Sequence, residues 1–223
     1  AGRLKGPGID KLEVELIRDL PDVTLDAREI LGLAGVEGNG QSELVEALTG
    51  LRKVEAGAIL LRGKDIANSS IRERNEAGVA HIPEDRQKRG LVLDYTLKEN
   101  FVLKNHREAP YSHGGFLDAQ AISDHADRVI EAFDVRSGEG GNSKARDMSG
   151  GNQQKAIIGR EFDQNPDLLI AVQQTRGLDV GSIEYIHKRL VEQRDSGKAV
   201  LLVALELEEI LDLSDRIAVI NHG

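Results

Sequence analysis

The sequence predicts an α/β fold in which helices cover both faces of a parallel sheet. Short continuous apolar runs, rich in β-branched residues, alternate with stretches of helical periodicity. Such runs are typical of strands buried on both faces, and the alternation is typical of parallel strands joined by helices. The 223 residues are enough for one domain with a substantial core, with room for a small second lobe.

The predicted elements follow one another along the chain. The first strand, residues 30–34, leads through a glycine-rich turn into a helix over 42–51. Further strands are predicted at 58–62, 79–82, 168–172, 200–205 and 217–220, and further helices at 153–162 and 183–194. The acidic stretch 206–210 is interpreted as a solvated helix face. The chain stops just past the last predicted strand, which indicates a segment of a longer polypeptide.

The middle of the chain has a different character. From about residue 86 to 148 the pattern is helical, most clearly over 119–133, and it is interrupted by Pro110 and several glycines. Five of the seven aromatic residues fall in this part. We therefore predict an α/β core formed by residues 1–85 and 156–223, and a helical lobe inserted at 86–155. The aromatic segment 95–116 is expected to form the core of that lobe, and the alternative that stays open is a patch that docks a partner protein.

Composition excludes several classes of function. Lys+Arg 29 against Asp+Glu 38 gives a net charge of −9, which argues against nucleic acid as a partner. The absence of cysteine excludes disulfide scaffolds, cysteine-based zinc sites and thiol nucleophiles. No apolar run approaches the roughly 20 residues that span a bilayer, and no signal-peptide core begins the sequence. A globular protein of the cytoplasm is expected.

The glycine-rich turn has the spacing of a phosphate-binding loop, G-x-x-x-x-G-K-[ST], with Gln41 in place of the lysine. Its glycines would let backbone N–H groups converge on a phosphate at the start of a helix, and Ser42 is placed to hold Mg²⁺ weakly. Glu37 adds a negative charge to the loop. The candidate nucleotide-binding residues are Gly35, Gly38, Asn39, Gly40, Gln41, Ser42 and Glu43.

Two other interpretations of this turn stay open at this point. A dinucleotide-binding loop needs G-x-G-x-x-G, but Glu43 stands where the third glycine belongs, so that pattern is incomplete. A glycine-rich turn between a strand and a helix can also bind nothing at all.

A second motif, M-S-G-G-N-Q-Q-K at 148–155, opens a predicted helix with a serine cap and unobstructed N–H groups. It resembles the signature L-S-G-G-[QN]-Q of ABC transporters. The resemblance extends along nearly the whole chain and implies a P-loop NTPase (RecA-like) core with an inserted α-helical signature lobe. The phrases IPEDRQKRGLVL and TRGLDVG look like the second, C-terminal nucleotide-binding domain of fused sugar and nucleoside importer ATPases. The signature residues would be Ser149, Gly150, Gly151, Asn152 and Gln153.

The resemblance also implies that the hydrolytic residues are missing. The phosphate-loop lysine corresponds to Gln41, the Walker B aspartate to Val172, the water-orienting glutamate to Gln173, and the switch histidine to Leu205. Glu84 corresponds to the Q-loop position and Asp179 to the D-loop. No aromatic residue precedes Tyr95 to stack on adenine. Binding of ATP and Mg²⁺ is therefore expected to be weak, and intrinsic hydrolysis negligible.

In the family, two nucleotide-binding domains face head to tail, and each signature closes the other's phosphate loop. The expected partners are a second such domain, in the same polypeptide or as a dimer, and membrane permease subunits. The expected place is the cytoplasmic, inner face of the cell membrane. Three alternatives stay open: an active homodimeric ATPase, an ABC ATPase of DNA repair or translation, and a nucleotide-free interaction module. The net charge and the lack of a Lys/Arg run speak against the second.

Overall fold

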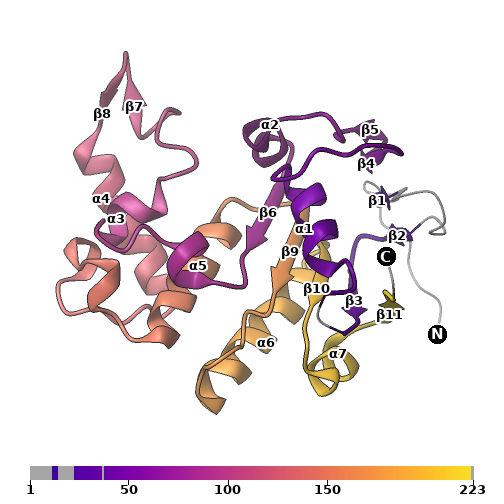
Figure 1. Ribbon diagram of the computed structural model, residues 1–223. Coiled ribbons are helices and arrows are strands. Elements are labelled where there is room, and N and C mark those ends of the chain that lie inside the picture. Colours follow the sequence, from indigo (N-terminus) through magenta and orange to yellow (C-terminus); the bar gives the residue numbers. More distant parts are fainter. Residues whose placement is uncertain (1–11, 15–22, 37, 222–223) are drawn as a thin grey trace. The chain divides into compact units, whose positions relative to one another are not determined.

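A computed structural model describes residues 12–14, 23–36 and 38–221 of the chain (Figure 1). The chain divides into two compact units. The first contains the described residues up to Val79, Asp167–Ile170 and the described residues from Leu190 onward. The second contains Ala80–Pro166 and Ala171–Arg189. The predicted boundaries of core and lobe, at 85/86 and 155/156, remain a prediction.

A five-stranded sheet has the order β11-β3-β10-β9-β6. Its strands are β3 (Glu29–Ala34), β6 (Val79–Ile82), β9 (Leu168–Val172), β10 (Ala199–Val203) and β11 (Arg216–Val219). β3 pairs in parallel with both neighbours, with Leu31 opposite Leu201 of β10 and opposite Arg216 of β11. Every residue of β9 and β10 is buried, which agrees with strands covered on both faces. The predicted α/β class is confirmed.

A second, antiparallel sheet in the first unit has the order β2-β1-β4-β5. It consists of β1 (Leu12–Val14), β2 (Val23–Leu25), β4 (Ile59–Leu61) and β5 (Lys64–Asp65). The predicted strand at 58–62 is therefore correct as a strand, but it lies in this antiparallel sheet, paired with β1 and β5. Its periodicity could not show which sheet it joins.

Helices α1 (Gln41–Thr49), α2 (Ile71–Glu76) and α7 (Leu207–Leu213) complete the first unit. A glycine allows α7 to pack close to β3, because a Cβ at Gly32 would lie only 2.9 Å from Cγ2 of Ile210. The acidic stretch at the start of α7 is a helix as predicted, but Glu209 is buried. The expectation of a wholly solvated face is wrong at that position.

Arg74 of α2 is buried and holds the end of α1. Its Nη1 donates to the carbonyl oxygens of Ala47 at 2.5 Å and Leu48 at 2.7 Å, and its Nη2 donates to Ala67 O at 2.8 Å. Carbonyl groups in the last turn of a helix have no partners within the helix, and a cation there also interacts favourably with the helix dipole. Arg74 therefore fastens the helix that follows the glycine loop.

The second unit is mainly helical. It contains α3 (Leu97–Phe101), α4 (Ala119–Ala132), α5 (Gly150–Asp163) and the first part of α6 (Val180–Asp195). Short turns of helix lie at Arg86–Gly90, Gly140–Asn142 and Ala145–Asp147. Its main core comprises Leu97, Phe101, Ala126, Val129, Val135 and Ala156.

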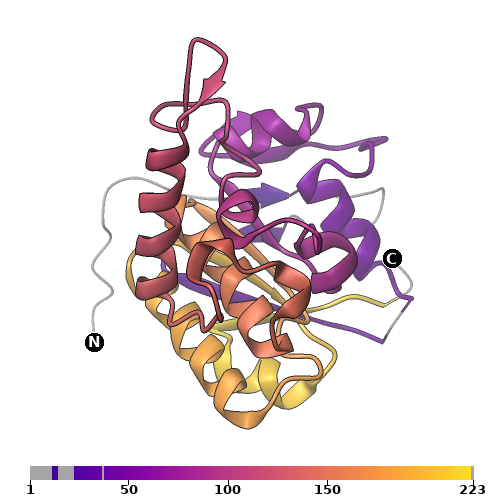
Figure 2. The same cartoon turned by 90° about the vertical axis from the view of Figure 1, so that its left-hand side faces the viewer.

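One part of the predicted helical stretch is a hairpin. Strands β7 (Ser112–His113) and β8 (Phe116–Leu117) pair antiparallel just before α4 begins, and the hairpin stands beyond that end of α4 in Figure 2. Strands of two residues carry no readable periodicity, so the sequence could not reveal them. The expected aromatic core is also divided: Phe101 and Tyr111 are buried, whereas Tyr95 is exposed and Phe116 is 82% exposed.

No helix among residues 12–14, 23–36 and 38–221 is long and apolar enough to cross a membrane.

Candidate functional site

The glycine loop joins β3 to α1 in the first unit. Gly38 and Gly40 have φ angles of 88° and 105°, which other residues rarely adopt. Asn39 donates its N–H to the carbonyl oxygen of Val36 at 3.2 Å, which closes the turn. Gly40 is the N-cap of α1 and has no side chain with which to cap it. The first N–H groups of α1 therefore face the loop without a side-chain cap, as in an anion-binding turn.

The space beside the loop differs between its two ends. A Cβ at Gly38 would meet nothing within 4 Å, so this part of the loop is open. At Gly35, by contrast, a Cβ would lie 2.6 Å from Nε2 of Gln41 and 2.8 Å from the carbonyl oxygen of Ile220. Gln41 is only 7% exposed. Its neutral amide is folded back against Gly35, in the position that the motif gives to a cation.

Ser42 and Glu43 are exposed in the first turn of α1. The backbone of the loop thus fits a phosphate group, and Ser42 could contribute one hydroxyl ligand to Mg²⁺. The side chains supply no positive charge, since the residue at the lysine position is Gln41. Glu37, whose charge was expected to weaken anion binding, lies outside the described residues.

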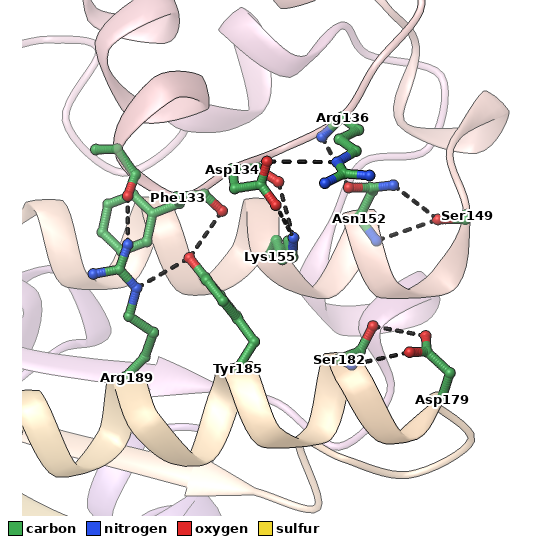
Figure 3. A network of polar contacts seen from close by, with 11 residues as sticks. Phe133, Asp134, Arg136, Ser149, Asn152, Lys155, Asp179, Ser182, Tyr185 and Arg189 are labelled. Atoms are coloured by element: carbon green, nitrogen blue, oxygen red, sulfur yellow. Dashed lines mark hydrogen bonds and ion pairs between the residues drawn. The ribbon is translucent and has the colours of Figure 1, made fainter.

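The predicted signature motif lies at the start of α5 in the second unit. Ser149 is the N-cap, and its Oγ accepts a hydrogen bond from the N–H of Asn152. The side-chain Nδ2 of Asn152 also donates to Ser149 Oγ, at 3.0 Å, and its Oδ1 accepts the N–H of Arg136 at 2.8 Å (Figure 3). Ser149 is exposed, so its hydroxyl is accessible at the helix N-terminus.

The two signature glycines leave room for neighbouring side chains. A Cβ at Gly150 would lie 2.9 Å from Nη2 of Arg86, and a Cβ at Gly151 would lie 2.6 Å from Oγ of Ser182. Gln153, the last predicted signature residue, is buried and donates to Ala145 O at 2.9 Å. Its amide therefore supports the preceding turn.

Asp179, predicted for the D-loop, caps α6. Its Oδ1 accepts the N–H of Ser182 at 3.0 Å and its Oδ2 accepts the Ser182 hydroxyl at 2.7 Å (Figure 3). These hydrogen bonds from Ser182 lower the pKa of Asp179, so the carboxylate is ionised at neutral pH. Oδ2 also lies 3.7 Å from the Cβ position of Gly151, so the structure brings the residues predicted for the D-loop and the signature together.

The end of β9 and the segment after it contain two of the positions predicted to be degenerate. Val172 is the buried last residue of the strand, and Gln173 has a φ of 45°. Nη1 of Arg176 lies 2.8 Å from the Oε1 of Glu84, the predicted Q-loop residue, and 3.4 Å from the Oε1 of Gln173. The structure thus brings Glu84 and Gln173 to the same guanidinium group. Leu205, the fourth degenerate position, belongs to the first unit and is exposed after β10.

A buried charged cluster in the second unit was missed by sequence reasoning. Glu161 of α5 is fully buried, and it pairs with Lys104 at 2.5 Å and Arg160 at 3.0 Å. Burial alone would raise the pKa of Glu161, but the two cations hold it below its ordinary value. Burial lowers the pKa of the adjacent His81 to about 4. Because these residues are far apart in the sequence, no local motif predicts that they cluster.

The described residues contain no group of three or more His, Cys, Asp or Glu side chains that could hold a metal ion. A Mg²⁺ ion at the glycine loop would therefore rely on Ser42, phosphate oxygens and water.

Comparison with solved structures defines the class of the fold. A nucleotide-free ATP-binding cassette of an ABC transporter aligns with a TM-score of 0.77, at 21% identity, over 96% of this chain and 87% of that chain. The ADP conformation of MJ1267, an ATP-binding cassette of an ABC transporter, aligns with a TM-score of 0.74, at 21% identity, over the same shares. The fold is that of a P-loop nucleotide-binding cassette, with the α/β arrangement that the sequence predicts.

The family follows from the sequence match. The family model described as ABC transporter matches residues 20–171, about two thirds of the chain, and the chain belongs to this family. Binding of ATP with Mg²⁺ is general in it.

Three relatives show where the chain stands within the family. It is 56% identical over 214 residues to the Guanosine import ATP-binding protein NupO of Bacillus subtilis and 57% identical over 203 residues to the Nucleoside import ATP-binding protein NupA of Lactococcus lactis. These matches cover 96% and 90% of the chain. The Glucose import ATP-binding protein TsgD13 of Haloferax volcanii is 44% identical over 91% of it. The chain spans 42%, 40% and 37% of the lengths of these three relatives.

Proposed function

We propose that this chain is an ATP-binding domain of an importer whose cargo is a nucleoside or a related sugar-containing solute. The names of the relatives at 56% and 57% identity, guanosine and nucleoside import, support this cargo class over the glucose named for the relative at 44%. Its partners would be membrane permease subunits and a second ABC domain, in the same polypeptide or in another subunit. The domain would then lie on the inner face of the cell membrane.

The domain's own nucleotide site is degenerate in this proposal. Gln41 supplies no charge to the phosphates, and Val172 cannot coordinate Mg²⁺. Gln173 and Leu205 cannot act as a general base or as the switch histidine. The loop backbone, with its exposed first helical turn, would hold nucleotide weakly through Gly38, Gly40 and Ser42. ATP bound there would stay unhydrolysed.

The Ser-Gly-Gly core of the predicted signature is intact, although Met148 stands in place of the leading leucine, and this core carries the proposal. Ser149 is exposed at the N-terminus of a 14-residue helix, with Gly150 and Gly151 in the first turn. A helix N-terminus with free N–H groups and a hydroxyl is well suited to a phosphate group. The domain would therefore act in trans, by completing the ATP site of its partner domain. Asp179, beside Gly151, would join the same interface.

A carboxylate placed in the signature tests this role. In the complete transporter, Gly150→Asp would set a negative charge against the γ-phosphate bound by the partner, and ATPase activity should fall by about 100-fold or more. Gly150→Ala is the matched control, because the atoms nearest to its Cβ belong to the guanidinium group of Arg86, the far end of a flexible side chain. Gly150→Ala should retain most of the activity. Unchanged turnover in Gly150→Asp would refute the signature role.

A further inference from the structure

The amide of Asn152 has only one possible orientation. Its Oδ1 lies 2.8 Å from the backbone nitrogen of Arg136, and a backbone N–H can only donate a hydrogen bond. The atom that faces Arg136 must therefore be the oxygen. The Nδ2 group is consequently directed to Ser149 Oγ, 3.0 Å away, as Figure 3 shows.

This orientation determines what the Ser149 hydroxyl can do. A serine hydroxyl has two acceptor lone pairs and one proton to donate. Both hydrogen bonds that Ser149 Oγ makes to described residues are accepted ones, from the backbone N–H of Asn152 at 3.4 Å and from its Nδ2. Neither of these hydrogen bonds uses the proton of the Ser149 hydroxyl. This proton is therefore directed away from Asn152, toward the exposed side of the helix start.

The residues around Asn152 hold it in this position. The segment before Arg136 is fixed to α5 by Lys155, whose Nζ donates to Asp134 Oδ2 at 2.6 Å and to Asp134 O at 3.0 Å. It is fixed to α6 by Tyr185, whose hydroxyl donates to the carbonyl oxygen of Phe133 at 2.8 Å. The backbone N–H that orients Asn152 thus belongs to a segment anchored on two helices.

We propose that Asn152 is a positioning residue: it orients the Ser149 hydroxyl so that its proton donates to a phosphate oxygen of the nucleotide in the partner domain. This inference rests on the proposed function of the signature. It assigns Asn152 a role that differs from direct contact with the nucleotide, because both ends of its amide are already hydrogen-bonded within the domain.

The test replaces the side-chain NH₂ group of Asn152 by an oxygen. Asn152→Asp keeps an oxygen to accept the N–H of Arg136, but it replaces the donor that faces Ser149 by an acceptor. The Ser149 proton should then turn inward to the new carboxylate, and steady-state ATPase activity of the complete transporter should fall at least 10-fold. The same variant should leave inhibition by ADP within twofold of the parent, because ADP lacks the γ-phosphate that the hydroxyl would contact.

A double-mutant cycle separates positioning from simple charge repulsion. Ser149→Ala removes the hydroxyl and should itself lower ATPase activity about 100-fold. In the Ser149→Ala background, Asn152→Asp should change the remaining activity less than twofold. A loss of the same size in both backgrounds would mean that the carboxylate acts by its charge, and would overturn the inference.

Two further outcomes are distinguishable. Full activity of Ser149→Ala would refute the proposed function itself, since the signature would then contribute no hydroxyl. Low activity of Ser149→Ala together with full activity of Asn152→Asp would overturn the positioning role alone.

Thermal unfolding checks that each variant folds. If Asn152→Asp is unstable, Asn152→Ala replaces it. The alanine variant keeps the hydrogen bond from the backbone N–H of residue 152 to Ser149 Oγ, but it frees the hydroxyl to rotate. It should lower ATPase activity threefold or more when Ser149 is present, and it should have no such effect in the Ser149→Ala background.

Discussion

Glu84 and Arg176 are joined by an ion pair, with Oε1 and Nη1 2.8 Å apart, although they are separated by 92 positions in the sequence. Arg176 also accepts a hydrogen bond at its carbonyl oxygen from Nη1 of Arg86, at 3.0 Å. These contacts tie the segment after β6 to the segment after β9, within the second unit. The carboxylate of Glu84, at the predicted Q-loop position, is therefore paired with the guanidinium group of Arg176.

This ion pair should contribute little to stability. Both side chains are partly exposed, and exposed pairs are worth at most about 1 kcal/mol. Glu84→Arg places two cations together and should lower the free energy of unfolding by less than about 1 kcal/mol, and adding Arg176→Glu should restore most of the loss. Urea unfolding of both single variants and the double variant measures this. A loss of several kcal/mol in either single variant would show that the pair acts through a larger network.

Restoring the missing cation should strengthen nucleotide binding. Gln41→Lys would bring a positive charge to the glycine loop, and we expect ATP to bind about tenfold more tightly at low salt, with the gain reduced at high salt. Gln41→Met is the control of similar length without charge. Fluorescence titration with an ATP analogue gives both dissociation constants. Equal affinities of the Lys and Met variants would show that this loop does not hold the phosphates.

Arg74 should be among the residues most important for stability in the first unit. Arg74→Met would remove the guanidinium donor from the carbonyl oxygens of Leu48 and Ala67, and it would leave Ala47 O with only the Gly50 N–H at 3.3 Å, so the free energy of unfolding should fall by about 3 kcal/mol. Arg72→Met, in the same helix but at an exposed ion pair, should cost less than about 1 kcal/mol. Urea unfolding at neutral pH compares the two. Equal stability of both variants would contradict the anchoring role of Arg74.

His81 should make the domain sensitive to mild acid. Its pKa is about 4 in the folded chain because desolvation at this partly buried position disfavours the charged imidazolium, against about 6.5 when unfolded. The unfolded state therefore takes up more protons, so this stability is fully present above pH 6.5 and is lost as the pH falls toward 4. The total loss from this residue approaches roughly 3 kcal/mol.

The corresponding experiment compares unfolding free energies at pH 7 and pH 5. His81→Gln should reduce the loss of stability over this interval. Some loss should remain, because burial also lowers the pKa of His125. An unchanged pH dependence in His81→Gln would show that the imidazole is not buried as the structure places it.

The sequence predicted the parallel sheet well for a physical reason. Strands β3, β9 and β10 are buried on both faces, so they are continuous apolar runs that local pattern alone can identify. The hairpin β7–β8 was missed because each strand has two residues. The glycine loop and the signature could be predicted from sequence because each depends on short local spacings, and their roles stay predictions.

The interactions that support these motifs were not predictable in the same way. The partner of the Asn152 side-chain oxygen is the backbone N–H of Arg136, 16 residues earlier. Nearly every residue has a backbone N–H, so the sequence cannot indicate which one the side chain contacts. Similarly, Gln41 could be recognised as a missing lysine, but its approach to Gly35 required coordinates. Contacts between distant residues depend on the folded backbone, so local pattern cannot reveal them.

Our proposal is that this domain does not hydrolyse ATP in its own site. It is tested most directly by phosphate release from the isolated chain with Mg·ATP, measured over a wide range of protein concentration. We expect a rate equal to that of buffer at every concentration. A protein-dependent rate that increases with the square of concentration would contradict it, because it would show an active homodimer in which the residues at positions 41, 172, 173 and 205 are sufficient for hydrolysis.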